Sequence, residues 1–132
     1  MATPVLLLDY NADERTMYCA ALEAAGFEVV VASSPSEALA LAVSRRPAAL
    51  VTRVLQPGSV FDGIEVIRRM KRDPLTAGIP IVITSSLLEV EYASDAMAAG
   101  CDEYLLLPVV PEDVAGAVAR AIATAALVRA AS

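Results

Sequence analysis

The sequence contains no histidine and no tryptophan, and its aromatic residues make up only 5% of the chain. The absence of histidine excludes His-ligated metal sites and nucleophiles that are activated by a histidine base. With so few aromatic rings, a platform on which nucleic-acid bases stack is not expected. Cys19 and Cys101 lie far apart in the chain. The spacing of a disulfide framework is therefore missing, and a reduced, cytoplasmic protein is expected.

Charge is also scarce, because 20% of the residues are charged and 57% are hydrophobic. A chain of 132 residues with this composition is expected to form one domain, residues 1–132, around a core that needs no disulfide or metal ion. The net charge of −6 argues against nucleic-acid binding by this domain. A membrane span is not expected either, because Arg120 and Arg129 interrupt the apolar tail 114–132.

Short runs of branched apolar residues alternate along the chain with segments of helical periodicity. We expect strands at residues 5–8, 29–32, 50–54, 81–84 and 103–106. Helices are expected at about 11–26, 34–46, 62–73, 93–100 and from 111 onward. Apolar strands that alternate with helices predict an α/β architecture, in which a parallel sheet is covered by helices on both faces.

Polar residues predict where several helices begin. Asn11 with Glu14 three residues later resembles a capping box, and Ser34 with Glu37 follows the same pattern. In the fourth helix, the apolar periodicity places Met97 on the inward face.

In an open α/β sheet, ligands and chemistry gather at the carboxyl ends of the strands. The residues at or just after these ends are Asp9, Tyr10, Arg53, Ser85 and Leu107. The turn after the first strand contains no glycine. A dinucleotide-binding fingerprint and a phosphate-binding P-loop are therefore both absent.

Three fragments of the sequence carry a resemblance to a known family. They are Pro47 to Val51, Gln56 to Gly58 followed by Asp62 to Ile67, and Gly100 to Leu105 followed by Pro108. In this order and spacing they resemble the receiver domain of bacterial response regulators, the CheY-like family, from about residue 4 to residue 126. The resemblance implies a doubly wound (βα)5 three-layer sandwich, with a five-stranded parallel sheet in the flavodoxin-like order 2-1-3-4-5. It also implies a signalling module of a two-component or phosphorelay system.

The resemblance assigns a place to each residue at the carboxyl ends of the strands. A typical receiver has two adjacent acids after the first strand and a phosphoacceptor aspartate at the end of the third. It has a hydroxyl at the end of the fourth strand and a lysine after the fifth. Here Asp9 matches the first acid and Ser85 the hydroxyl. Tyr10, Arg53 and Leu107 stand at the positions of the second acid, the phosphoacceptor and the lysine.

The chemistry of the missing groups predicts an inactive phosphorylation site. Phosphoryl transfer to a carboxylate needs a nucleophilic oxygen and a Mg²⁺ ion held by oxygen ligands. Arg53 is a cation and no nucleophile, and Leu107 cannot form a charged clamp on a phosphoryl group. We expect no catalytic residue, no metal ion and no cofactor, with Arg53 paired to Asp9 in the metal's place. Ser85 is expected to bond to nearby backbone, whereas Tyr10 either shields the pocket or simply packs.

The last helix is apolar on nearly all sides, which is typical of a helix that is buried on more than one side. In receivers this helix, the fourth helix and the fifth strand form the common output and dimer face. The resemblance therefore implies a protein partner or a homodimer there, and an alanine-rich solvent surface is the alternative. The expected interface residues are Tyr104, Ala115, Ala119, Ile122 and Ala126.

Other possibilities stay open from the sequence. The cations of residues 68–72 form either a solvated helix face or a docking site for an acidic partner. The domain could be a receiver phosphorylated at Asp62, or a pseudo-receiver that senses a small molecule in the altered pocket. A flavodoxin-like nucleotide binder is the remaining alternative, and the missing phosphate loop opposes it.

Overall fold

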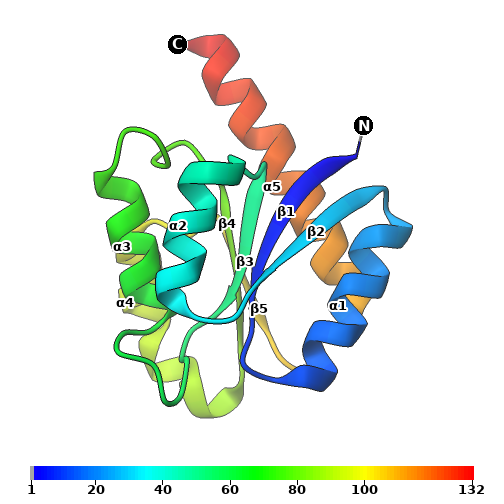
Figure 1. The fold of residues 1–132 in the computed structure, drawn as a ribbon, viewed down its shortest axis with the longest axis vertical. Helices are drawn as coiled ribbons and strands as arrows, with labels where there is room; N and C mark the ends of the chain where they lie inside the picture. Colours follow the sequence, from blue (N-terminus) through cyan, green and yellow to red (C-terminus); the bar gives the residue numbers. More distant parts are fainter. Residues whose placement is uncertain (1) are drawn as a thin grey trace.

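The computed structural model describes residues 2–132, so Met1 lies outside the described part of the chain. Five parallel strands form one sheet in the order β2-β1-β3-β4-β5, with helices on both faces (Figure 1). The strands are β1 (Thr3–Leu8), β2 (Phe27–Ala32), β3 (Ala49–Arg53), β4 (Ile81–Ser85) and β5 (Glu103–Leu106). The helices are α1 (Ala12–Ala24), α2 (Pro35–Arg45), α3 (Gly63–Arg72), the 3₁₀ helix η1 (Leu87–Tyr92), α4 (Ala93–Ala99) and α5 (Pro111–Ala131). The α/β fold class and the strand order that the sequence predicts are confirmed.

Strand β1 supplies side chains to both halves of the core, because successive residues of a strand point to opposite faces. Leu6 and Leu8 pack in the cluster that includes residues of α2, α3 and α4. Val5 and Leu7 pack in the cluster that includes residues of α1 and α5. Figure 1 shows these two groups of helices on opposite sides of the sheet. Burial on both faces explains why β1 is apolar from Val5 to Leu8.

Side-chain caps set the starts of three helices. Asn11, Ser34 and Asp62 each accept the backbone N–H of the residue three positions later, at 2.9, 3.1 and 3.0 Å. Gly63, the first residue of α3, lies so close to β3 that an added Cβ would collide with the carbonyl oxygen of Arg53. The start of α3 therefore packs directly against the end of β3, the central strand.

The segment after β4 differs from the single helix that the sequence predicts. A 3₁₀ helix, η1, precedes α4, and α4 itself has only 7 residues. Met97 is 59% exposed, so its predicted inward position is wrong, whereas Ala96 is fully buried. The reason is that so short a helix contacts the core along one narrow face, which Ala96 fills.

Helix α5 has 21 residues and ends at Ala131, beyond residue 126, where the family resemblance ends. Its first half belongs to the core, where Val114, Ala117, Val118 and Ala121 are buried. Its last turns project beyond the sheet (Figure 1). By length and composition alone α5 could cross a membrane. The burial of its first half is typical of a core helix in a globular domain, which passes the same test of length and composition.

Candidate functional site

The register of the sheet brings the strand ends of the predicted site to one edge. Leu8 pairs with Thr52, Arg53 with Thr84, and Ser85 with Leu106. The residues that end β1, β3, β4 and β5 therefore lie side by side, as expected for an α/β fold. We call this side of the sheet, where the parallel strands have their C-terminal ends, the carboxyl edge, and the opposite side the amino edge.

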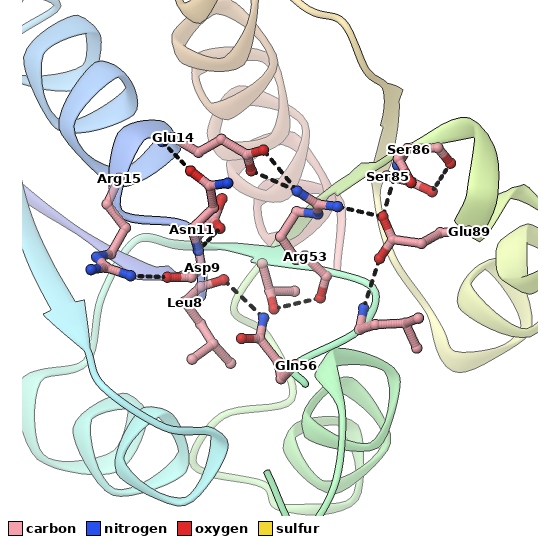
Figure 2. A network of polar contacts seen from close by, with 12 residues as sticks. Leu8, Asp9, Asn11, Glu14, Arg15, Arg53, Gln56, Ser85, Ser86 and Glu89 are labelled. Atoms are coloured by element: carbon pink, nitrogen blue, oxygen red, sulfur yellow. Dashed lines mark hydrogen bonds and ion pairs between the residues drawn. The ribbon is translucent and has the colours of Figure 1, made fainter. Parts of the chain in front are cut away.

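Arg53 reaches two carboxylates across this edge. Its Nη1 donates to both carboxylate oxygens of Glu14 at 2.7 and 2.8 Å, and its Nη2 donates to Oε1 of Glu89 at 2.6 Å. Figure 2 shows the guanidinium held between these two side chains. Arg53 is 4% exposed, so the three residues form a buried ion cluster, which we call the Arg53 cluster.

The predicted pair between Arg53 and Asp9 is wrong. Asp9 is buried, but its Oδ1 accepts the backbone N–H of Asn11 at 2.8 Å, which turns the short side chain back onto its own turn. Among the described residues its Oδ2 has no hydrogen-bond donor. The longer side chains of Glu14 and Glu89 reach over the edge to the guanidinium instead.

Glu14 is in place because of the way α1 begins. Asn11 accepts the backbone N–H of Glu14, which is the first half of the predicted capping box. The second half is not formed, since the Glu14 carboxylate binds Arg53 and the N–H of Asn11 donates to Asp9. The local pattern predicts the start of the helix correctly but not the partner of its glutamate.

Glu89 lies in η1 and joins three segments of the edge. Its Oε1 accepts the backbone N–H of Ser86 at 2.8 Å, and its Oε2 accepts that of Leu55 at 3.1 Å. Together with the bond from Arg53, these contacts fasten the segment after β4 to the loop after β3. Glu89 is 4% exposed.

Burial and charge act on the Arg53 cluster in opposite directions. Burial by itself would lower the pKa of Arg53, but the hydrogen bonds from Glu14 and Glu89 outweigh it and raise that pKa above its usual value. Burial would raise the pKa of Glu89, yet the Ser86 N–H and Arg53 hold it below its usual value. Both groups are therefore ionised at neutral pH.

Asp9 is held in a different state beside the same cluster. Burial, followed by the closeness of the Glu14 carboxyl group, raises the pKa of Asp9 from 3.8 to about 7. Charge repulsion from Glu14 acts in the same direction, while the Asn11 N–H and Arg53 oppose it. Asp9 therefore carries a proton for much of the time at neutral pH.

Tyr10 and Gln56 flank the cluster. The Tyr10 ring lies with its centroid 5.2 Å from the Arg53 guanidinium carbon, within the range of a cation–π contact, although Tyr10 is 47% exposed. Gln56 is buried, and its Nε2 donates to the carbonyl oxygen of Leu8 at 3.2 Å. Tyr10 thus covers one side of the guanidinium, as the shielding interpretation expects.

Ser85 bonds to nearby backbone, as the sequence predicts. Its hydroxyl donates to the carbonyl oxygen of Ser86 at 3.1 Å and accepts from the Tyr104 hydroxyl at 2.6 Å. The Leu107 N–H donates to the Ser85 carbonyl oxygen at 2.6 Å. The Tyr104 side chain therefore points toward Ser85 at the end of β4.

Four of the predicted interface residues, Ala115, Ala119, Ile122 and Ala126, lie along one side of α5, and Tyr104 lies on β5. Ala115 is 6% exposed and belongs to the core, so it has almost no surface to offer a partner. Ala119 lies in a hollow lined by residues of α1, on the side away from α4. Ile122 is partly buried, whereas Ala119 and Ala126 are exposed, the latter on the projecting end of α5. At Ala115 and Ala119 this side of α5 is turned toward α1, so grouping these two residues with α4 in one interface is wrong.

The alternative of phosphorylation at Asp62 can be compared with the geometry. The Asp62 carboxylate caps α3 through the N–H of Glu65, so it is engaged at the helix start. Within residues 2–132, no group of three or more His, Cys, Asp or Glu side chains is placed to hold a metal ion.

Glu14 and Glu89 are the site residues that sequence reasoning missed. The pattern Ser86-Leu87-Leu88-Glu89 is a capping-box sequence that could have indicated a turn over the strand ends. A cation at the end of a central strand also requires carboxylate partners when it is buried. Neither signal states which acids those partners are.

Comparison with known proteins agrees with this architecture. A family model described as the response regulator receiver domain matches residues 5–119. The phosphate regulon transcriptional regulatory protein PhoB of Pseudomonas aeruginosa is 34% identical over 110 residues, which are 83% of this chain and 47% of PhoB. The transcriptional regulatory protein PrrA of Mycobacterium tuberculosis is 31% identical over 106 residues, 80% of this chain and 44% of PrrA. The chain thus spans less than half the length of these relatives.

Solved structures give the same result. A putative response regulator from Chloroflexus aurantiacus superposes with a TM-score of 0.85 at 29% identity, covering 93% of this chain and 99% of that one. NtrX from Brucella abortus superposes with a TM-score of 0.89 at 25% identity, covering 99% of this chain and 29% of NtrX. The chain therefore belongs to the receiver domain family of two-component response regulators.

Proposed function

We propose that this receiver domain signals without being phosphorylated, through contacts with other proteins, and that it catalyses no reaction. The observation that supports the proposal is the buried guanidinium of Arg53, held by Glu14 and Glu89. It stands where the family resemblance places the phosphoacceptor aspartate.

Three features of the edge oppose phosphoryl transfer. Arg53 offers no nucleophilic oxygen, and its charge would repel the Mg²⁺ ion that neutralises a phosphoryl group. Leu107 cannot supply the ammonium group that would clamp the phosphate. The carboxylates of Glu14 and Glu89 are already bound to Arg53, so a metal ion would have to displace a guanidinium to use them.

The proposal is tested by incubating the protein with acetyl phosphate, or with beryllofluoride, in millimolar Mg²⁺. Intact mass should show no added phosphoryl group, and the unfolding temperature should not change with beryllofluoride. A typical receiver domain serves as the positive control. A gain of one phosphoryl group by the wild-type chain contradicts the proposal.

The variant Arg53→Asp is the matched control in the same experiment. It restores a carboxylate at β3 but keeps Tyr10 and Leu107, so we expect it to remain unphosphorylated. If this variant is readily phosphorylated, Arg53 alone blocks the chemistry and the contribution of the other two residues is disproved.

Protein contacts at the face built from α4, β5 and the start of α5 are the proposed means of signalling. Met97, Leu106 and Val110 are 59%, 43% and 56% exposed there, which is more apolar surface than a solvated face needs. The relatives named above are transcriptional regulators, and we propose a signalling protein or a second copy of this domain as the partner. A cytoplasmic location is proposed with it.

A second candidate function is the sensing of a small molecule. A hollow of about 370 Å³ lies at the carboxyl edge beside the cluster, with Asp9, Tyr10, Arg15 and Gln56 in its lining. Its size is within the range of small-molecule sites, and its lining is polar. Native mass spectrometry of the protein purified from its own cells would detect a bound molecule, which the protein-contact proposal does not expect.

A further inference from the structure

The opposite edge of the sheet carries a second feature that the proposed function does not use. Two hollows of about 400 and 220 Å³ lie beside the amino ends of β3 and β4. They share Gly78, Pro80, Ala125 and Arg129 in their linings, so they adjoin as one continuous depression. We call it the amino-edge groove, with Arg46 at one end, Lys71 at the other and Arg129 between them.

The walls of the groove carry apolar side chains between the cations, and they are held in place. One wall is the connection from α3 to β4, where Leu75 is 52% exposed and Ile79 is almost fully buried. The Thr76 hydroxyl donates to the Met70 carbonyl oxygen at 2.8 Å, which ties this connection to α3. The other wall is the projecting end of α5, with Ile122 in its lining. A groove that is already formed loses little conformational entropy when a ligand binds.

The charges of the groove are unusual for this chain. Six of the ten Lys and Arg side chains lie within ion-pair distance of a carboxylate. Of the four cations without such a partner among the described residues, three line the amino-edge groove, namely Arg46, Lys71 and Arg129. Asp102 is the one acid in the lining, and its Oδ2 already accepts the Ile81 N–H at 2.7 Å. The fourth, Arg15, lies beside Asp9. Lys71 Nζ donates to the Ala77 carbonyl oxygen at 3.2 Å but has no carboxylate partner among the described residues. A protein with a net charge of −6 thus places three of these four cations at one depression.

We propose that the amino-edge groove binds an extended acidic peptide segment of a partner protein, in which carboxylates alternate with apolar side chains. Cations at both ends and in the middle fit several charges along a strand better than a single anion. Guanidinium groups bind carboxylates through paired hydrogen bonds, and the apolar walls between them accept the intervening side chains. This inference does not depend on the Arg53 cluster, because the groove lies at the other edge of the sheet.

A nucleic acid is the less favoured occupant. Its long array of phosphates would extend past the groove onto a molecule of net negative charge. A short peptide interacts mainly with the cations of the groove, because charges more than roughly 8 Å away are largely screened at physiological salt. A single-stranded oligonucleotide therefore belongs in the test as a competitor.

The probe is a fluorescein-labelled peptide in which glutamates alternate with leucines, and its binding is followed by fluorescence anisotropy. We expect saturable binding that weakens as salt is added, and little binding of the same peptide with glutamines in place of glutamates. Backbone amide NMR shifts on titration should cluster at the groove, for instance at Gly78 and Ala125. Shifts confined to the carboxyl edge of the sheet would overturn the proposal.

The double variant Arg46→Asn, Arg129→Gln should weaken peptide binding by about tenfold or more, since two charge-assisted contacts are lost. Asparagine is chosen because residue 46 has φ 45°, a left-handed conformation that Asn tolerates. The matched control is Arg120→Gln on the same helix, where Arg120 pairs with Glu103 outside the groove. Equal binding by the double variant and wild type, or equal binding of the oligonucleotide and the peptide, would overturn the proposal. An unchanged unfolding temperature confirms that the variants are folded.

Discussion

At the scale of single residues, the Arg53 cluster is a balance between desolvation and charge pairing. Taking a guanidinium and two carboxylates out of water is costly, and the loss is offset only when every charge has well-placed partners. Glu89 meets this requirement best, because it also accepts two backbone N–H groups. Its side chain is 6% exposed, against 17% for Glu14.

Glu89→Gln should therefore lower the free energy of unfolding by about 2 to 4 kcal/mol, and Glu14→Gln by about 1 to 2 kcal/mol. In both variants Arg53 loses a charged partner, but the more exposed site can recruit water. Urea unfolding followed by circular dichroism measures the difference. Glu65→Gln, at an acid on the surface of α3, is the control and should cost much less. If Glu89→Gln costs no more than this control, the cluster does not fasten η1 to the sheet.

Asp9 makes a separate contribution that depends on pH. Its pKa is about 7 in the folded chain and 3.8 as the reference for the unfolded chain, so the folded state holds the proton more tightly. The stabilising effect of that proton is complete below about pH 4 and is lost as the pH rises through 7. The ionisation of Asp9 should therefore lower the free energy of unfolding of the wild-type chain as the pH rises from about 4 to above 7.

Asp9→Asn should remove this pH-dependent loss of stability, because the amide keeps an acceptor for the Asn11 N–H but does not ionise. We expect the variant to gain roughly 2 to 4 kcal/mol relative to wild type between pH 4 and pH 8. Urea midpoints across that range, for both proteins, measure the gain. A stability difference that does not change with pH would contradict the raised pKa of Asp9.

At the scale of helices and strands, local sequence patterns predicted most of what the structure contains. Apolar strand runs and the caps Asn11, Ser34 and Asp62 depend on neighbours within a few residues, so they could be recognised in the sequence. The partners of Arg53 could not, since Glu14 and Glu89 are 39 and 36 residues away from it in the chain. The contacts of these two glutamates with Arg53 depend on how α1 and η1 pack against the sheet. Met97 was misplaced for a similar reason, because periodicity does not reveal how short α4 is.

At the scale of the whole molecule, the two edges of the sheet differ in chemistry. The carboxyl edge carries a buried cation held by two carboxylates, whereas the amino edge carries three cations without carboxylate partners among the described residues, around a groove with apolar side chains. A receiver whose carboxyl edge is fastened by ion pairs has less freedom to rearrange there. Its output would then depend on which surfaces remain free for partners.

The exposed apolar side chains beside α4 and β5 give the last prediction, which concerns assembly. If Met97 and Leu106 lie in an interface, the double variant Met97→Glu, Leu106→Glu should stay folded but lose self-association or partner binding, because charges would be buried in an apolar contact. Ala119→Glu is the matched control, since this residue is exposed toward α1 and away from the face. Light scattering on a concentration series measures the oligomeric state, and pull-down from the native extract measures partner binding. If the wild-type chain is monomeric at high concentration and every partner binds the double variant equally, this face is a solvated surface and not an interface.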